Sequence, residues 1–130
     1  MRVVFDTNIY ISALILPGSS AHRAIQLIID GQDRLVISRP ILDEILTTLA
    51  RKFCRDAEAL SRTALWVMEL AELVYPETRV HVFNDDPDNR VLECAIAGKA
   101  KAIVTGDKAM LAIEISHGVR ILSLAAYLSR

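Results

Sequence analysis

The stretch Asp85–Leu111, DDPDNRVLECAIAGKAKAIVTGDKAML, decides the fold. A helical pattern of apolar residues begins at Asp88 and stops at Gly98, which is a good residue to end a helix. The short apolar run Ala102–Thr105 follows as a strand, and Asp107 then opens another helix, through about residue 115. A helix that leads at once into a buried strand and a further helix is typical of an alternating α/β chain with a parallel sheet.

The same alternation extends through the rest of the chain. Further strands are predicted at Val3–Phe5, Arg34–Ser38, Val80–Phe83 and Val119–Leu122. Further helices are predicted at Ile9–Leu16 with Asn8 as the cap, from Ser19–Ser20 to about Asp30, from Ser38 to about Phe53, at Asp56–Val74 and at Leu124–Leu128. The strands are rich in Val and Ile on both sides, which indicates a sheet covered on both faces. Without repeats or linkers, residues 1–130 are expected to form a single domain.

Composition narrows the class of protein. A hydrophobic fraction of 52% rules out a disordered chain, and a net charge of −1 rules out a highly basic nucleic-acid coat protein. A local basic groove remains compatible with the 15 Lys and Arg residues. The cysteines, Cys54 and Cys94, form no CxxC motif, so a structural zinc site is not expected. No signal peptide and no apolar run of about 20 residues is visible, which favours a soluble, cytoplasmic protein with no membrane span.

Acidic residues follow four of the five predicted strands. They are Asp6 after the first, Glu44 in the helix after the second, Asp85, Asp86 and Asp88 after the third, and Asp107 after the fourth. Ligands of open parallel sheets bind at the carboxyl ends of the strands, so these acids are expected to converge. Helix capping would account for each acid alone, but not for several repelling charges at one rim.

A divalent cation would make such a cluster tolerable. The basic neighbours Arg90 and Lys108 are predicted to point away from it, and oxygen ligands without His or Cys suit Mg²⁺ or Mn²⁺. Such ions commonly act on phosphates, and the chain has no P-loop for a nucleotide. Hydrolysis of a phosphodiester is therefore the reaction we expect.

Four stretches of the chain resemble the PIN-domain family. They are VVFDTNIYISALILPGSSAHRAI (Val3–Ile25), SRPILDEIL (Ser38–Leu46), Asp85–Leu111 and GVRILSLAAYL (Gly118–Leu128). Within the family, the chain is similar to the VapC-like toxin components of prokaryotic toxin–antitoxin systems. The resemblance implies a three-layer α/β sandwich with a central parallel five-stranded sheet. It also implies an endoribonuclease that depends on Mg²⁺ or Mn²⁺, works as a homodimer and is silenced by a cognate antitoxin.

The resemblance also implies roles for individual residues. The catalytic, metal-binding acids would be Asp6, Glu44, Asp88 and Asp107, and the polar residues supporting the metal and its waters would be Asn8 and Thr105. Asn89 and Ala109 replace acids that many relatives carry, which leaves open whether one or two ions bind. Asp86 is a candidate to compensate for the lost charge.

Basic residues and the Asp56–Val74 helix are candidates for contacts with other molecules. RNA phosphates could be held by Arg23, Arg39, Arg90 and Lys108. The Asp56–Val74 helix is apolar nearly all round, so it should be buried in the core or in an interface. Its Trp66 either packs against the sheet or belongs to a dimer or antitoxin surface.

Two other classes of function stay open on the sequence. Haloacid-dehalogenase and receiver domains, which transfer phosphate, also place an Asp after their first strand. Dehalogenase-like enzymes usually need a second Asp two residues later, where this chain has Asn8. A non-catalytic PIN module that binds RNA or protein through the same rim is the other alternative.

Overall fold

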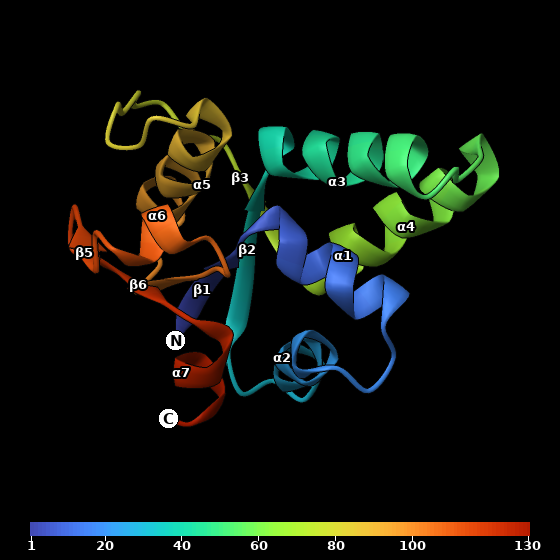
Figure 1. Ribbon diagram of the computed structural model, residues 1–130, viewed down its shortest axis with the longest axis horizontal. Coiled ribbons are helices and arrows are strands. Elements are labelled where there is room, and N and C mark those ends of the chain that lie inside the picture. The colour runs from blue at the N-terminus through green and yellow to red at the C-terminus, as the bar shows by residue number, and fades with distance from the viewer.

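The polypeptide alternates between strands and helices, as expected. The computed structural model describes all 130 residues and is shown in Figure 1. The strands are β1 (Arg2–Phe5), β2 (Arg34–Ser38), β3 (Ala71–Val74), β4 (Ala102–Val104), β5 (Ile115–Ser116) and β6 (Val119–Leu122). The helices are α1 (Thr7–Ile15), α2 (Ser20–Ile29), α3 (Arg39–Lys52), α4 (Ala57–Leu70), α5 (Asp86–Ala97), α6 (Lys108–Leu111) and α7 (Leu124–Leu128).

The strands form one sheet in the order β3-β2-β1-β4-β6-β5. Five strands are parallel, in agreement with the prediction, but a sixth strand was not foreseen. This strand, β5, has two residues and pairs antiparallel with β6 at the edge. The turn between them places His117 and Gly118 at positive φ, the backbone conformation that a tight hairpin needs.

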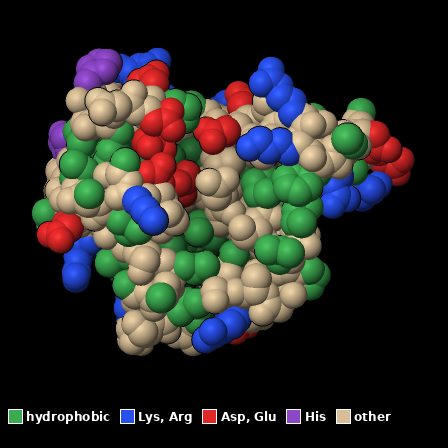
Figure 2. Space-filling view, viewed as in Figure 1, with side chains coloured by type: hydrophobic (Ala, Val, Ile, Leu, Met, Phe, Trp, Pro, Cys, Tyr) green, Lys and Arg blue, Asp and Glu red, His purple; other side chains and the backbone are tan.

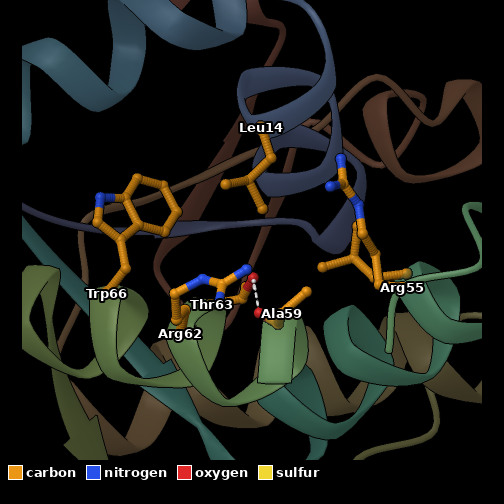
Figure 3. A pocket seen from close by; sticks show the side chains of 7 residues that line it. Leu14, Arg55, Ala59, Arg62, Thr63 and Trp66 are labelled. Carbon is orange, nitrogen blue, oxygen red and sulfur yellow. Dashed lines mark hydrogen bonds between the residues drawn. The ribbon is translucent and has the colours of Figure 1, made fainter. Parts of the chain in front are cut away.

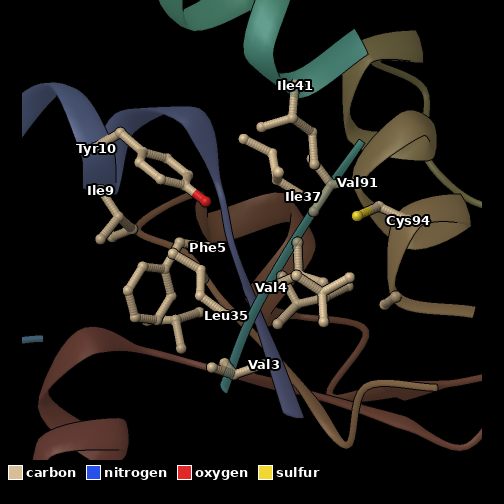
Figure 4. Close-up of a cluster of buried hydrophobic side chains, with 14 of the residues drawn as sticks. Val3, Val4, Phe5, Ile9, Tyr10, Leu35, Ile37, Ile41, Val91 and Cys94 are labelled. Carbon is tan, nitrogen blue, oxygen red and sulfur yellow. The ribbon is translucent and has the colours of Figure 1, made fainter. Parts of the chain in front are cut away.

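Both faces of the sheet are covered by helices. Figure 4 shows the β1 side chains alternating, with Phe5 beside Tyr10 on one face and Val4 beside Val91 and Cys94 on the other. The Phe5 ring lies 6.1 Å from that of Tyr10 in α1 and 5.6 Å from that of Tyr127 in α7, both in edge-to-face geometry. Helix α5 packs on β1, β2 and β4. The result is a three-layer α/β sandwich with an apolar core on each side of the sheet.

The third strand lies elsewhere than predicted. The expected Asp56–Val74 helix ends at Leu70, and Ala71–Val74 pairs in parallel with β2 as β3. The predicted strand Val80–Phe83 belongs to no sheet, because its backbone donors bond to side chains of α5 instead. An apolar helix C-terminus and a short buried strand have the same composition, so the hydrophobic pattern could not separate them.

Helix α4 is less buried than its composition predicts. Only Val67 is fully buried, while Leu65 is 66% exposed and Met68 is 40% exposed. Of the two predicted alternatives, burial of the whole helix in the core is therefore wrong, and burial in an interface stays a prediction. Its exposed apolar side chains remain free to contact another molecule.

Smaller differences affect helix ends. The cap of α1 is Asp6 rather than Asn8, α5 begins two residues before Asp88, and α6 ends at Leu111. Cys54 is exposed, whereas Cys94 is buried. None of the helices has the length and apolar character needed to cross a membrane.

Candidate metal centre

The acidic residues predicted at the strand exits lie at one edge of the sheet. Asp6 directly follows β1, Asp107 follows β4 after two residues, Glu44 stands in the second turn of α3, and Asp88 stands in the first turn of α5. Figure 2 shows acidic side chains gathered where α5, α6 and α3 approach one another. The topology thus places side chains from four separate segments around one space.

Asp6 is the most tightly held of these acids. Its carboxylate is buried and accepts two hydrogen bonds, from the Thr7 N–H at 2.8 Å and from the Thr105 hydroxyl at 2.7 Å. The Thr105 oxygen in turn accepts the Asp107 N–H at 3.0 Å. Thr105, which is fully buried, therefore links the first acid to the segment that carries the last one.

Asp107 and Asp88 are held differently. Asp107 caps α6, and its Oδ1 accepts the N–H groups of Ala109 and Met110 at 2.8 and 3.1 Å. Asp88 is only 7% exposed, yet it takes part in no side-chain hydrogen bond or ion pair. A buried carboxylate without a partner is costly, so Asp88 is the unusual group at this edge.

The charges at this edge repel one another. Burial, followed by repulsion from Asp6 and then from other acids, raises the pKa of Asp88 to about 7. Burial and then repulsion from Asp6 also raise the pKa of Glu44. The pKa of Asp6 is raised mainly by burial, although the hydrogen bonds from Thr105 and Thr7 oppose the rise. No Lys or Arg forms an ion pair with any of these four acids.

A fifth acid joins the cluster, and it is not the one expected. The charge of Asp85, the N-cap residue of α5, contributes to the raised pKa values of Asp6, Glu44 and Asp88. Asp86, the candidate auxiliary acid, instead lies 3.4 Å from Arg90 and accepts a hydrogen bond from Asn89 at 3.3 Å. The boundary of α5 decides which of the two neighbours faces the cluster, and the sequence did not define that boundary.

Asn8 and Asn89 also differ in their surroundings. Asn8 is exposed on α1 and takes no part in the hydrogen bonds around Asp6. Asn89 is buried, and its carboxamide bonds to the chain before α5. Asn89 therefore does more than leave this position uncharged, because it anchors the chain before α5.

The chemistry of this edge fits a hard divalent cation. All candidate ligands are carboxylate oxygens. The side chain of Asp88 accepts no hydrogen bond although the residue is only 7% exposed, and the buried hydroxyl of Thr7 has no partner. No three acidic, His or Cys side chains are close enough to enclose an ion as they stand. An ion would therefore have to draw the carboxylates inward, which their mutual repulsion now opposes.

The fold and this edge define an α/β protein with a cluster of carboxylates at the carboxyl ends of parallel strands. Residues 2–109 match the PIN domain, and the chain belongs to the PIN-domain family. Members of this family are generally nucleases that use divalent metal ions. This membership favours neither a dehalogenase-type nor a receiver-type phosphotransfer reaction.

One further protein and two solved structures are similar to this chain. The uncharacterized protein MJ1680 of Methanocaldococcus jannaschii is 30% identical over 118 residues, which cover 88% of this chain and 76% of that protein. The fold is similar to a chain in VapBC2 from Rickettsia felis bound to a promoter DNA fragment, with a TM-score of 0.68, 16% identity and coverage of 95% and 98%. It is also similar to a chain in VapBC-1 from nontypeable Haemophilus influenzae, with a TM-score of 0.65, 20% identity and coverage of 96% and 99%.

Proposed function

We propose that this protein is an endoribonuclease that depends on Mg²⁺ or Mn²⁺ and acts as the toxin of a toxin–antitoxin pair. The observation that carries the proposal is the buried, unpartnered carboxylate of Asp88 among four other acids with no neutralising base. A divalent cation would supply the missing positive charge. It would also bring a bound water of lowered pKa and neutralise charge on a phosphodiester.

The residues at this edge would divide the work between them. Asp6, Asp88, Asp107 and Glu44 would hold the ion. Thr105 would keep Asp6 and the start of α6 in place through its two hydrogen bonds. The exposed Asn8 would be free to contact water or substrate at the mouth of the site.

Exposed basic side chains would hold the RNA backbone. Arg23, Arg39 and Lys108 are exposed, although Arg39 also pairs with Asp43 at 2.9 Å. Arg90 is mostly buried and lies 2.8 Å from Glu93, so its charge is largely committed within the protein. We therefore assign phosphate contacts first to the three exposed residues and to Arg90 last.

A groove between α1 and α4 is the proposed docking site for the antitoxin. It has a volume of about 290 Å³. It is lined by Leu14, Leu49, Arg55, Ala59, Arg62, Thr63 and Trp66. Figure 3 shows Trp66 at one end and Arg55 at the other, with Leu14 above them. An antitoxin segment with an apolar side chain and a carboxylate would match this lining.

A homodimer is the second assembly that we propose. The exposed Leu65 and Met68 lie on α4 outside the groove and provide an apolar surface for a second copy. Light scattering at micromolar concentration is expected to give twice the 14.4 kDa mass of the chain. The Leu65→Arg variant is expected to give the monomer mass.

Cleavage assays test the proposed activity. The purified protein is incubated with transfer and ribosomal RNA in Mn²⁺, in Mg²⁺ or in EDTA, and we expect cleavage only with metal. Asp6→Asn and Asp88→Asn should reduce the rate more than about 100-fold, beyond the usual effect of residues that only orient a ligand. Asp30→Asn, at the exposed residue that follows α2, is the matched control.

Titration calorimetry with Mn²⁺ separates the nuclease from a non-catalytic module. A protein that binds Mn²⁺ through these acids but cleaves no RNA would support the non-catalytic PIN module. Cleavage that persists in Asp6→Asn, with circular dichroism unchanged, would refute the site assignment.

A further inference from the structure

The segment between β3 and α5 follows a defined path without belonging to the sheet. It runs from residue 75 to residue 85 and has no helix or strand. Val80 and Phe83 are nevertheless buried, and the segment ends at Asp85, one of the five acids of the cluster. Something other than backbone pairing must therefore hold this segment in place.

The side chain of Asn89 provides most of that hold. Its Oδ1 accepts the N–H groups of Val82 at 3.0 Å and Phe83 at 2.8 Å. Its Nδ2 donates to the Phe83 carbonyl at 3.0 Å and to Asp86 Oδ1 at 3.3 Å. Both acceptor positions and both donors of the carboxamide are used, and the residue is 2% exposed.

Glu93, one helical turn further along α5, adds a second point of attachment. Its buried carboxylate accepts the Val80 N–H at 2.9 Å and pairs with Arg90 at 2.8 Å. One face of α5 thus binds the segment at Val80, Val82 and Phe83. Only Asn84 then separates this anchored stretch from Asp85, whose carbonyl accepts the Asp88 N–H at 3.1 Å.

We infer that Asn89 is a positioning residue of the metal centre, because its carboxamide fixes the turn that brings Asp85 beside Asp88. The inference rests on the proposed function. An amide is needed here because an aspartate would lose both N–H donors, to Phe83 and to Asp86.

A double-mutant cycle on Asn89 and Asp85 tests this inference with Mn²⁺ affinity as the readout. Asn89→Ala and Asp85→Asn should each weaken Mn²⁺ binding, by about 10-fold, as expected for groups that support a metal site. Because Asn89 acts through Asp85, the double variant should be no weaker than the weaker single variant. Independent effects that multiply to about 100-fold, or unchanged affinity in Asn89→Ala, would overturn the inference.

Two further measurements separate positioning from a loss of stability. Asp33→Asn removes the charge of another buried residue with several hydrogen bonds, at the opposite ends of the strands from the cluster, and should leave Mn²⁺ affinity unchanged. If Asn89→Ala does not fold, Asn89→Asp keeps an acceptor oxygen but loses both donors and adds a negative charge, so it is compared by the exchange of the Val82 and Phe83 amides.

Amide hydrogen exchange tests the positioning even if the proposed metal activity fails. In either Asn89 variant, the Val82 and Phe83 amides should exchange faster and the Asp85 amide resonance should shift. If wild type binds no Mn²⁺, the proposed function fails. The positioning of the turn by Asn89 is then decided by these three amides, and it fails if they keep their wild-type behaviour.

Discussion

Two carboxyl groups of this protein are equally buried but have opposite surroundings. Asp33 and Asp88 are 6% and 7% exposed. Burial alone would raise the pKa of Asp33, but hydrogen bonds from the Met1 amine, Arg130 and Tyr127 hold that pKa below its usual value. Asp88 has no such partners, and burial together with Asp6 and three other acids raises its pKa to about 7.

Asp33 is therefore a carboxylate that stabilises the fold, whereas the negative charge of Asp88 is not neutralised by any neighbouring group. Asp33, just before β2, accepts the Tyr127 hydroxyl at 2.8 Å and joins α7 to the sheet, and Arg130 stacks 4.4 Å above the Tyr127 ring. Asp88 lies at the opposite, carboxyl-terminal ends of the strands and joins nothing. Unbalanced charge that lowers stability is expected where a ligand is to bind.

Removal of the Asp33 carboxylate should have the largest effect on stability. Asp33→Ala leaves the buried Tyr127 hydroxyl and Arg130 without their acceptor, so we expect a loss of about 3–5 kcal/mol in the free energy of unfolding. Urea unfolding at pH 7 measures the change, and Asp30→Asn on the exposed surface should stay within about 0.5 kcal/mol of wild type. A loss below 1 kcal/mol, on the order of a surface pair, would show that Asp33 is not a structural anchor.

Removal of the Asp88 charge should raise the free energy of unfolding, whereas removal of the Asp33 carboxylate should lower it. The pKa of Asp88 is higher in the folded protein than in the unfolded chain, so the folded state binds its proton more tightly. Stability from this group is complete below pH 4 and is lost as the pH rises to about 7. Asp88→Asn should therefore stabilise the metal-free protein at pH 8, by about 1–3 kcal/mol.

The pH dependence provides the check on that sign. Wild type should lose stability between pH 4 and pH 7 in EDTA, and Asp88→Asn should lose much less over the same range. Asp33 has the opposite pH dependence, because its pKa is lower in the folded protein than in the unfolded chain. Its contribution to stability is therefore present at neutral pH and is lost only when the pH falls below the pKa of the unfolded chain. An Asp88→Asn variant less stable than wild type at pH 8 would mean that Asp88 has a stabilising partner.

The sequence was sufficient to predict the acidic edge of the sheet but not the anchor at Asp33. The edge follows from local rules, because an acid after a short apolar strand lies at the carboxyl end wherever the strands pair in parallel. Asp33 depends on partners at positions 1, 127 and 130, which no local pattern connects. Its role becomes visible only when the two ends of the chain are placed together.

The errors at β3 and Asp85 have a related cause. Ala71–Val74 becomes a strand because it pairs with β2, and its apolar composition fits a helix equally well. Val82 and Phe83 bond to Asn89 instead of to a neighbouring strand, so a strand-like composition gave a wrong assignment. That attachment also sets the start of α5, and the start of α5 decides that Asp85 rather than Asp86 faces the acidic cluster. A helix boundary predicted from sequence is uncertain by one or two residues, so it could not distinguish these two neighbours.

The smallest change in stability is expected at two consecutive acids of α3. One is paired with a base and the other faces the acidic cluster, as in the comparison of Asp33 with Asp88. Asp43 is exposed and pairs with Arg39 at 2.9 Å, so Asp43→Asn should change the unfolding free energy by less than about 0.5 kcal/mol. Glu44 is half-buried, and burial and then Asp6 raise its pKa. Glu44→Gln should therefore stabilise the metal-free protein at pH 8, by about 0.5–1 kcal/mol, and give no gain at pH 4. An equal gain at pH 8 from Asp43→Asn would mean that net charge, rather than the shared acidic cluster, sets the stability of this edge.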